Sequence, residues 1–174
     1  MYLDCGIASV RDWAPGDIAA LPQLANNPRI ARNMLVLPSP YQLLHAVSWV
    51  GQCMDGRQRT AWAIEVDDAL AGGVSLMLRG EPEAHSAGIA YWLGEPFWGR
   101  GIATAVVGGV CNYAFDELGL KRLDTAVLEW NPASMRVLEK CGFAREGVLR
   151  RSVTKEGRLV DRMMFARLAE DNDD

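Results

Sequence analysis

Between Ile89 and Thr104 the chain reads I-A-Y-W-L-G-E-P-F-W-G-R-G-I-A-T. An apolar, aromatic run typical of a strand stops at residues 94–96, and a tight loop with Gly99 and Gly101 then leads into an alanine-rich helix start. This order presents unpaired backbone N–H groups to an anion such as a phosphate, and the two glycines let the backbone turn sharply beside a ligand. Arg100 can add a charge-assisted contact. An ordinary strand-to-helix connection is the alternative, so the stretch needs support from elsewhere in the chain.

A second stretch, N-P-A-S-M-R-V-L-E-K-C-G-F over Asn131–Phe143, follows another strand-like run. Pro132 suits a first helical position, and Gly142 suits the left-handed position just past a helix end. Asn131 and Ser134 are three residues apart and could simply cap the helix. The functional alternative is that Asn131 offers its amide to the backbone of a ligand.

In this order and at this spacing the two stretches resemble the GNAT superfamily of acetyl-CoA-dependent N-acetyltransferases. The closest resemblance is to the RimJ/RimL type, which acetylates protein amino termini and, in relatives, small amines. Four segments carry the resemblance. They are Tyr91–Thr104, similar to the pyrophosphate loop; Asn131–Phe143, similar to the second CoA-contacting element; Glu146–Arg150 with Gly157–Asp161, similar to the closing hairpin; and Ile30–Asn33 with Pro38–Tyr41, similar to the substrate-side helices.

The resemblance implies an α+β (α/β) fold, the GNAT acyl-CoA N-acyltransferase fold. Its central sheet is mixed and mostly antiparallel, splays apart at the CoA site, and carries helices on both faces. The length of 174 residues predicts one domain, and the resemblance implies that residues 1–174 form a single N-acetyltransferase domain. We expect acceptor-side helices and the first strand in 1–60, the acetyl-CoA-binding core in 86–143 and the closing hairpin in 144–168.

The resemblance also assigns roles to residues. Backbone amides after Gly99 would hold the pyrophosphate of acetyl-CoA, the end of the preceding strand would supply backbone groups to the pantetheine and the thioester oxygen, and Asn131 would bind the pantetheine arm. Ser134 would contact CoA and act as the catalytic proton donor to the leaving thiolate, with a helix-turn hydroxyl as the alternative. The implied cofactor-binding residues are Trp92, Leu93, Trp98, Gly99, Arg100, Gly101, Ile102, Ala103, Thr104, Asn131 and Ser134. The acceptor-side candidates are Asn33, Tyr41 and Tyr91, although aromatic residues in such places are more often core.

The chain departs from the family pattern at several positions. Many members carry a tyrosine four residues beyond the equivalent of Ser134, and here that position is Leu138. The carboxylates that the subgroup often carries would align with Gly88 and Ala105, so both are missing. The general base is therefore ordered water or a carboxylate such as Glu95, for which a solvated loop charge is the alternative.

The reaction implied is direct attack of a primary amine, from a protein amino terminus or a small molecule, on the thioester of acetyl-CoA through a tetrahedral intermediate. Two alternatives stay open. The chain could be an acyl-CoA-binding GNAT-like sensor or regulatory module without efficient transfer, because the usual glutamate and tyrosine are missing. It could also transfer a longer acyl group, which the pocket volume near the thioester would decide.

The composition of the chain argues against several classes of partner and ligand. The net charge of −4 does not suggest a nucleic-acid or membrane surface. Four cysteines without a C-x-x-C pair and only two histidines argue against a metal site, and Cys111 and Cys141 read as reduced thiols in helices. No secretory signal or membrane-length apolar run is visible, so we expect a cytoplasmic protein. A homodimer is left open on base rates alone.

Overall fold

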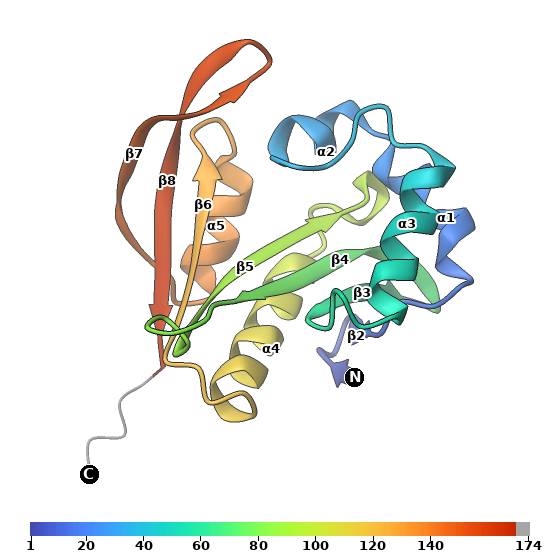
Figure 1. Ribbon diagram of the computed structural model, residues 1–174, viewed down its shortest axis with the longest axis horizontal. Coiled ribbons are helices and arrows are strands. Elements are labelled where there is room, and N and C mark those ends of the chain that lie inside the picture. Colours follow the sequence, from blue (N-terminus) through green and yellow to red (C-terminus); the bar gives the residue numbers. More distant parts are fainter. Residues whose placement is uncertain (170–174) are drawn as a thin grey trace. The chain divides into compact units, whose positions relative to one another are not determined.

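The computed structural model describes residues 1–169 (Figure 1). The chain forms two compact units, and strands β4 and β5 and helix α4 each contribute to both. Unit 1 consists of Met1–Ser75 and Tyr91–Val106, and unit 2 consists of Leu76–Ala90 and the chain from Val107 onward. This division leaves the expected single domain over residues 1–174 a prediction.

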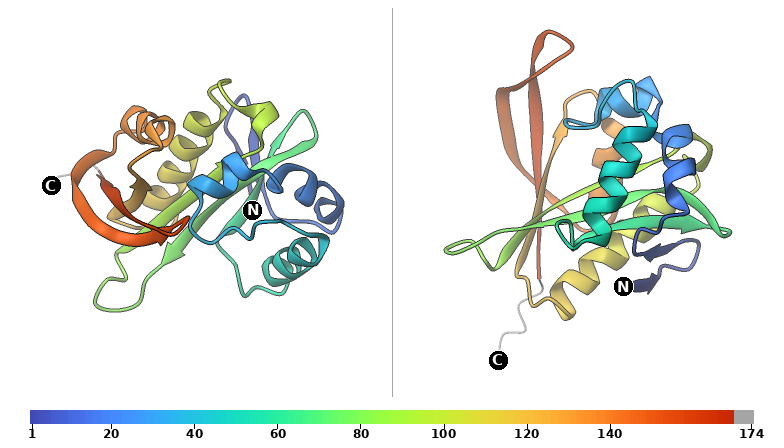
Figure 2. Two further views of the ribbon diagram at one scale, coloured as in Figure 1. Left: turned by 90° about the horizontal axis from the view of Figure 1, so that it is seen from above. Right: turned by 45° about the vertical axis from the view of Figure 1, so that its right-hand side comes forward.

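Unit 1 holds the amino-terminal strands, the first three helices and the glycine loop. Its elements are β1 (Tyr2–Asp4), β2 (Ser9–Arg11), α1 (Asp17–Ala25), α2 (Pro28–Asn33), α3 (Leu43–Met54), β3 (Ala61–Val66), most of β4 (Ala69–Leu78), the end of β5 (Ser86–Leu93), the short 3₁₀ helix η1 (Glu95–Phe97) and the start of α4 (Ile102–Asp116). Helices α1 and α3 lie side by side in both views of Figure 2. They bury apolar side chains with Trp13 and with Leu70 of β4, which forms the core of this unit.

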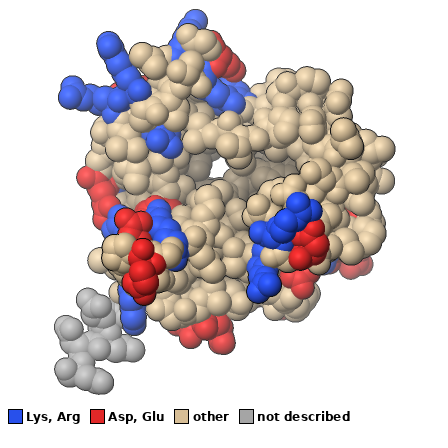
Figure 3. All heavy atoms as spheres, in the orientation of Figure 1, with Lys and Arg blue, Asp and Glu red and all other residues tan. Residues whose placement is uncertain are grey.

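Unit 2 holds the remaining parts of β4, β5 and α4, then β6 (Arg122–Leu128), α5 (Pro132–Lys140), β7 (Ala144–Lys155) and β8 (Arg158–Leu168). The largest fully buried side chains here include Leu123, Leu138 and Phe165. Strands β7 and β8 form a long hairpin, and on the face shown in Figure 3 many Lys and Arg side chains gather at its upper end.

The hydrogen-bonded strand order is β1-β2-β3-β4-β5-β6-β8-β7, an eight-stranded mixed sheet. Strands β5 and β6 are parallel, whereas β6, β8 and β7 pair antiparallel, as do β1 to β4. The parallel ladder covers only Ser86–Gly88 against Arg122–Asp124, although both strands continue beyond it. The expected mixed and mostly antiparallel sheet is therefore confirmed.

Several local expectations need correction. The sequence predicts an opening strand and bend over Leu3–Trp13, but the structure has two short strands there, because Gly6 turns the chain with a φ of +79°. The turn at Pro15–Asp17 predicts Asp17 as a helix cap. In the structure Asp17 is the first residue of α1, and its carboxylate is bound by the Arg11 guanidinium and the Ala14 N–H. The sequence predicts a helix over Tyr41–Met54, and the structure has it over Leu43–Met54. Within residues 1–169, no helix is long and apolar enough to cross a membrane.

Candidate functional site

The glycine loop of unit 1 has the backbone geometry that the sequence predicts. Gly99 and Gly101 have φ values of +72° and +81°, in the left-handed region that only glycine adopts without strain. Helix α4 starts directly afterwards, and its first turn is marked by the Ala105 N–H donating to the Gly101 carbonyl at 3.1 Å. The N–H groups of Ile102 and Ala103 precede that turn and have no acceptor inside the helix.

The loop also leaves space for a ligand beside its backbone. A Cβ on Gly99 would meet nothing within 4 Å, and one on Gly101 would meet only the Ile7 side chain at 3.8 Å. The glycines are thus required by backbone conformation, not by crowding from the protein itself. Open backbone next to a helix start fits a phosphate group of acetyl-CoA.

A network of polar and aromatic contacts fixes the entrance to this loop. The Trp98 indole N–H donates to the Leu93 carbonyl at 2.8 Å, and the Arg29 guanidinium lies 4.9 Å from the Trp98 ring centroid. Arg29 also forms an ion pair with Glu95, whose carboxylate accepts a second hydrogen bond from the Asn27 amide at 2.7 Å. Trp98 and Glu95 therefore hold α2 against the end of β5, and Glu95 is not an isolated loop carboxylate.

The last residues of β5 lie unusually close to β4. A Cβ on Gly72 would stand 2.1 Å from the Trp92 carbonyl oxygen and 3.0 Å from the Leu93 Cα. A Cβ on Gly73 would stand 3.0 Å from the Trp92 indole nitrogen. The two β4 glycines thus position the backbone of Trp92 and Leu93, while the Trp92 side chain packs on the core of unit 1.

The other predicted residues of unit 1 have varied surroundings. The Arg100 side chain is half exposed. One of its guanidinium nitrogens lies 3.9 Å from an Asp67 carboxylate oxygen, a long ion pair, and the guanidinium carbon lies 5.9 Å from the Phe97 ring centroid. Asn33 ends α2 and donates to the Arg29 carbonyl at 3.1 Å. Tyr91 is partly buried, and Thr104 lies in the first turn of α4.

Tyr41 belongs to the core cluster and is only 6% exposed. Burial raises the pKa of its hydroxyl to about 12, and its ring packs edge-on against His45. This environment argues against direct contact with an acceptor, and Tyr41 has no part in the function proposed below.

The second candidate element lies in unit 2, where Asn131 and Ser134 stand at the start of α5, just beyond β6. The Asn131 Oδ1 accepts a hydrogen bond from the Ser134 N–H at 3.2 Å, so Asn131 caps α5. The capping bond uses only the carbonyl oxygen of the side chain and leaves the Nδ2 group as a donor. The cap and the ligand-binding role are therefore compatible. Ser134 is half-buried.

The departures from the family pattern have clear structural surroundings. Leu138 is completely buried on α5, so this position belongs to the core and not to the reaction. A Cβ on Gly88 would meet the end of the flexible Met77 side chain at 2.8 Å. Cys111 and Cys141 are buried and not joined in a disulfide, and Cys111 lies in α4 whereas Cys141 stands just beyond the end of α5. Burial raises the pKa of Cys111 to about 12.

The sequence did not reveal a charged network at the amino-terminal ends of β5 and β6. Asp124 is 8% exposed and accepts two hydrogen bonds from the Arg79 guanidinium, at 2.7 and 2.8 Å. Arg79 also binds the Ser86 hydroxyl, and Arg122 joins Asp124 to Glu146 of β7. The Arg79 hydrogen bonds outweigh burial and lower the pKa of Asp124. No local sequence pattern could reveal this network, because its residues are far apart in the chain.

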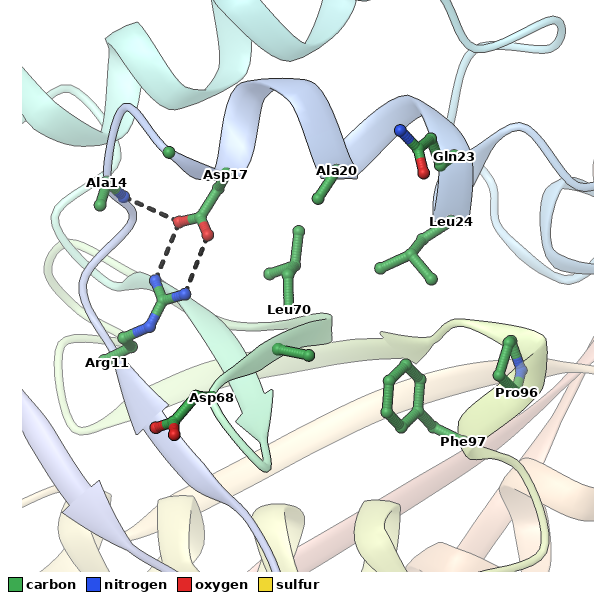
Figure 4. A pocket seen from close by; sticks show the side chains of 12 residues that line it. Arg11, Ala14, Asp17, Ala20, Gln23, Leu24, Asp68, Leu70, Pro96 and Phe97 are labelled. Atoms are coloured by element: carbon green, nitrogen blue, oxygen red, sulfur yellow. Dashed lines mark hydrogen bonds and ion pairs between the residues drawn. The ribbon is translucent and has the colours of Figure 1, made fainter.

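Unit 1 also has an open depression of about 630 Å³ between α1, the β3–β4 turn and η1. Figure 4 shows Leu24 and Leu70 directed toward it, Phe97 at its border and the Arg11–Asp17 ion pair at one end. Its lining contains none of the predicted cofactor-binding residues. The Arg11 guanidinium donates two hydrogen bonds of 2.9 Å to the Asp17 carboxylate, so these two charges already neutralise each other.

Comparison with known proteins agrees with these elements. The sequence profile of the acetyltransferase (GNAT) domain matches residues 9–144. A probable N-acetyltransferase, YjcK of Bacillus subtilis (strain 168), is 41% identical over 107 residues, which are 62% of this chain and 59% of that protein.

Two solved structures share the fold. A RimL ribosomal L7/L12 α-N-protein acetyltransferase in complex with coenzyme A has a TM-score of 0.86 at 21% identity and covers 98% of this chain and 99% of its own. The RimJ protein of Mycobacterium smegmatis, in complex with CoA-disulfide, has a TM-score of 0.82 at 25% identity. The match covers 100% of this chain and 88% of the RimJ chain.

Proposed function

The chain belongs to the GNAT acetyltransferase family and is an acetyl-CoA-dependent N-acetyltransferase, and from this premise we propose that its acceptor is the amino terminus of a protein. The glycine loop carries the donor half of this proposal, the binding of acetyl-CoA. Its left-handed Gly99 and Gly101 lead into a helix start with open backbone N–H groups, which suits the pyrophosphate of acetyl-CoA. The overall similarity to RimL and RimJ favours a protein acceptor.

The absence of the usual carboxylates at Gly88 and Ala105 is consistent with an α-amine acceptor. A free α-amino group has a pKa of about 7.7–8.0, whereas a lysine side chain has about 10.4. Near neutral pH an appreciable fraction of the α-amine is already neutral, and ordered water can accept its proton. A lysine acceptor would need a stronger base. Glu95 does not fill that role in the proposal, because Arg29 and Asn27 already bind its carboxylate.

The reaction then proceeds in two steps. The neutral amine attacks the thioester carbon, and backbone N–H groups at the end of β5, around Trp92 and Leu93, stabilise the resulting oxyanion. The nitrogen of the intermediate releases a proton to ordered water, the C–S bond breaks, and the Ser134 hydroxyl gives a proton to the departing thiolate and regains one from water. The Asn131 Nδ2 group donates to the pantetheine arm of acetyl-CoA.

Thiol release from acetyl-CoA tests the proposal. Peptides with free amino termini, the same peptides with blocked termini and one internal lysine, free amino acids, polyamines and aminoglycosides would serve as acceptors. We expect turnover with free-terminus peptides, lost in Gly101→Val and reduced in Asn131→Ala when acetyl-CoA is below its KM. Gly80→Ala is the control, because a Cβ there meets nothing within 4 Å. Turnover confined to lysine, polyamines or aminoglycosides would refute the protein amino terminus as acceptor.

A sensor that binds acetyl-CoA without transfer is not favoured by the relatives, which are N-acetyltransferases. Binding by calorimetry with no turnover on any acceptor would restore it. We place the activity in the cytoplasm, in accordance with an amino-terminal protein substrate, and a homodimer stays a prediction.

A further inference from the structure

The tip of the β7–β8 hairpin is strongly basic in an acidic protein. The segment Arg150–Arg162, here called the basic tip, contains five of the 18 basic residues and two of the 22 acidic residues. Its net charge is therefore +3, while the remaining 13 basic and 20 acidic residues give −7. A separation of charge this sharp creates a local positive potential on a molecule of net charge −4.

Most of this charge is not neutralised within the protein. Arg150, Arg151 and Arg158 are exposed, and no ion pair joins their guanidinium groups to another residue of the described chain. The exposed apolar side chains Leu149 and Leu159 accompany them, at 38% and 62% exposure. The surface thus combines free guanidinium groups with apolar contacts.

A β-bulge lies on the β7 side of the basic tip, at Arg150 and Arg151. The β7–β8 register shifts between Leu149 and Val153, and Arg151 adopts a left-handed φ of +49°. The Arg151 N–H donates to the Asp161 carboxylate at 2.7 Å, and the Arg162 guanidinium donates to the Ser152 hydroxyl at 2.9 Å. Bulges of this kind redirect side chains beside functional sites. They also disturb the outer edge of β7, so a partner that adds a strand to this edge is not favoured.

The basic tip is anchored next to the start of α5 within unit 2. The Glu129 N–H donates to the Asp161 carbonyl at 3.1 Å, and Leu128 of β6 is in register with Arg162. Asn131 follows Glu129 by two residues. The same bulged segment is therefore tied to the element that holds Asn131 and Ser134.

The chemistry of the tip favours one class of partner. Residues 144–164 contain no aromatic side chain or histidine on which a nucleobase could stack, and the rest of the protein is acidic, which disfavours a nucleic acid. Polyamines and aminoglycosides are cations that the guanidinium groups would repel. An extended peptide with carboxylates and some apolar side chains matches both features of the surface.

We propose that the basic tip binds the acceptor polypeptide through acidic residues that follow its amino terminus, so that the enzyme selects acidic amino-terminal segments. The inference rests on the proposed function, since it specifies the acceptor of the same site. Basic residues on an edge strand can also serve only to prevent aggregation. The two roles differ in whether the charge of the peptide matters.

A charge-swap experiment tests the proposal. Two short peptides would share their first residues and carry either glutamate or lysine at the following positions. We expect wild-type kcat/KM to be about tenfold or more higher for the acidic peptide at low salt, and the difference to shrink as salt is raised. In Arg150→Glu/Arg158→Glu the preference should disappear or invert, mainly through KM for the peptide, with KM for acetyl-CoA unchanged.

The control variant Arg57→Glu/Arg59→Glu makes the same change of charge at exposed positions of unit 1 and should keep the wild-type preference. Thermal unfolding of both variants checks that they remain folded. Equal kcat/KM for the two peptides in the wild type would overturn the inference, as would an equal loss for both peptides in the hairpin variant. A selective rise in KM for acetyl-CoA would instead make the tip a cofactor surface.

Peptide binding measured by fluorescence anisotropy separates this inference from the proposed function. Charge-dependent binding of the acidic peptide without acetylation would leave the binding inference intact and refute the acceptor. Competition by a short RNA stronger than by the acidic peptide would show that the tip recognises phosphate, and would overturn the inference.

Discussion

Asn131 offers two groups that a single substitution can separate. Its Oδ1 caps α5 by accepting from the Ser134 N–H, whereas its Nδ2 group is the donor assigned to the pantetheine. Asn131→Asp keeps a capping oxygen but removes the donor, and aspartate caps helices about as well as asparagine. We expect the melting temperature of Asn131→Asp to stay near the wild-type value while KM for acetyl-CoA rises about tenfold or more, the equivalent of about 1.4 kcal/mol or more.

Asn131→Ala gives the comparison, because it removes both groups. It should lose roughly 1 kcal/mol of unfolding free energy in addition to the rise in KM. Wild-type kinetics for Asn131→Asp, together with a destabilised Asn131→Ala, would restrict Asn131 to capping.

Gly101 allows backbone strain to be distinguished from ligand binding. Its φ of +81° makes any side chain costly, although a Cβ would have room, so Gly101→Ala should lose about 1–2 kcal/mol of stability. We expect KM for acetyl-CoA to rise at the same time, because the loop must shift to relieve the strain. Gly119→Ala is the matched control, with a φ of +66° and nothing within 4 Å of its Cβ. It should reduce the melting temperature without changing KM, and similar KM values for both variants would contradict a role for the loop.

At the scale of elements, the contact between β4 and β5 depends on Gly72. A Cβ there would lie 2.1 Å from the Trp92 carbonyl oxygen, and the atom it meets is backbone that cannot rotate away. We expect Gly72→Ala to destabilise the protein by about 3 kcal/mol, at the upper end for overpacked sites, measured by chemical denaturation. Gly51→Ala is the control in the interior of α3, where a Cβ meets nothing, and it should be neutral or stabilising. Equal stability of the two variants would exclude the close approach.

Elements marked by local signals could be predicted from the sequence. Pro132 and Gly142 fix the two ends of α5, and the structure has both in the expected conformations, with a φ of +81° at Gly142. The glycine loop is predictable for the same reason, since left-handed φ values leave a direct trace in the residue type. The β3–β4 hairpin follows from its polar turn, in which Asp67 and Asp68 both adopt positive φ.

Features that depend on tertiary contacts could not be predicted. Asp17 has the sequence context of a cap, but the Arg11 guanidinium, six residues earlier, binds its carboxylate instead. Tyr41 follows a polar, proline-rich segment and nevertheless lies in the core. The positions of Trp98 and Glu95 depend on Arg29, which is more than sixty residues away in the chain. Periodicity and turn residues carry no information about such partners.

At the scale of the whole molecule, each unit relies on a buried carboxylate held by arginine. In unit 1 Asp17 is 5% exposed. Burial acts to raise the pKa of its carboxyl, but the hydrogen bonds from Arg11 and Ala14 outweigh burial and bring this pKa below its ordinary value. In unit 2 the hydrogen bonds from Arg79 lower the pKa of Asp124. Arginine remains charged at every relevant pH, so only the carboxylates respond to acid.

These shifts predict how stability depends on pH. A carboxylate whose folded-state pKa lies below its unfolded value stabilises the protein fully above about pH 4, and this contribution is lost as the pH falls through the folded-state pKa. We therefore expect the melting temperature to change little between about pH 7 and 5 and to fall steeply below about pH 4. Asp124→Asn should lose roughly 1–3 kcal/mol at neutral pH, because the Arg79 guanidinium keeps a weaker partner, and its acid slope should be shallower than that of the wild type. Differential scanning calorimetry across this range measures both effects. An acid slope in Asp124→Asn as steep as in the wild type would show that the Arg79–Asp124 pair is not a source of the acid sensitivity.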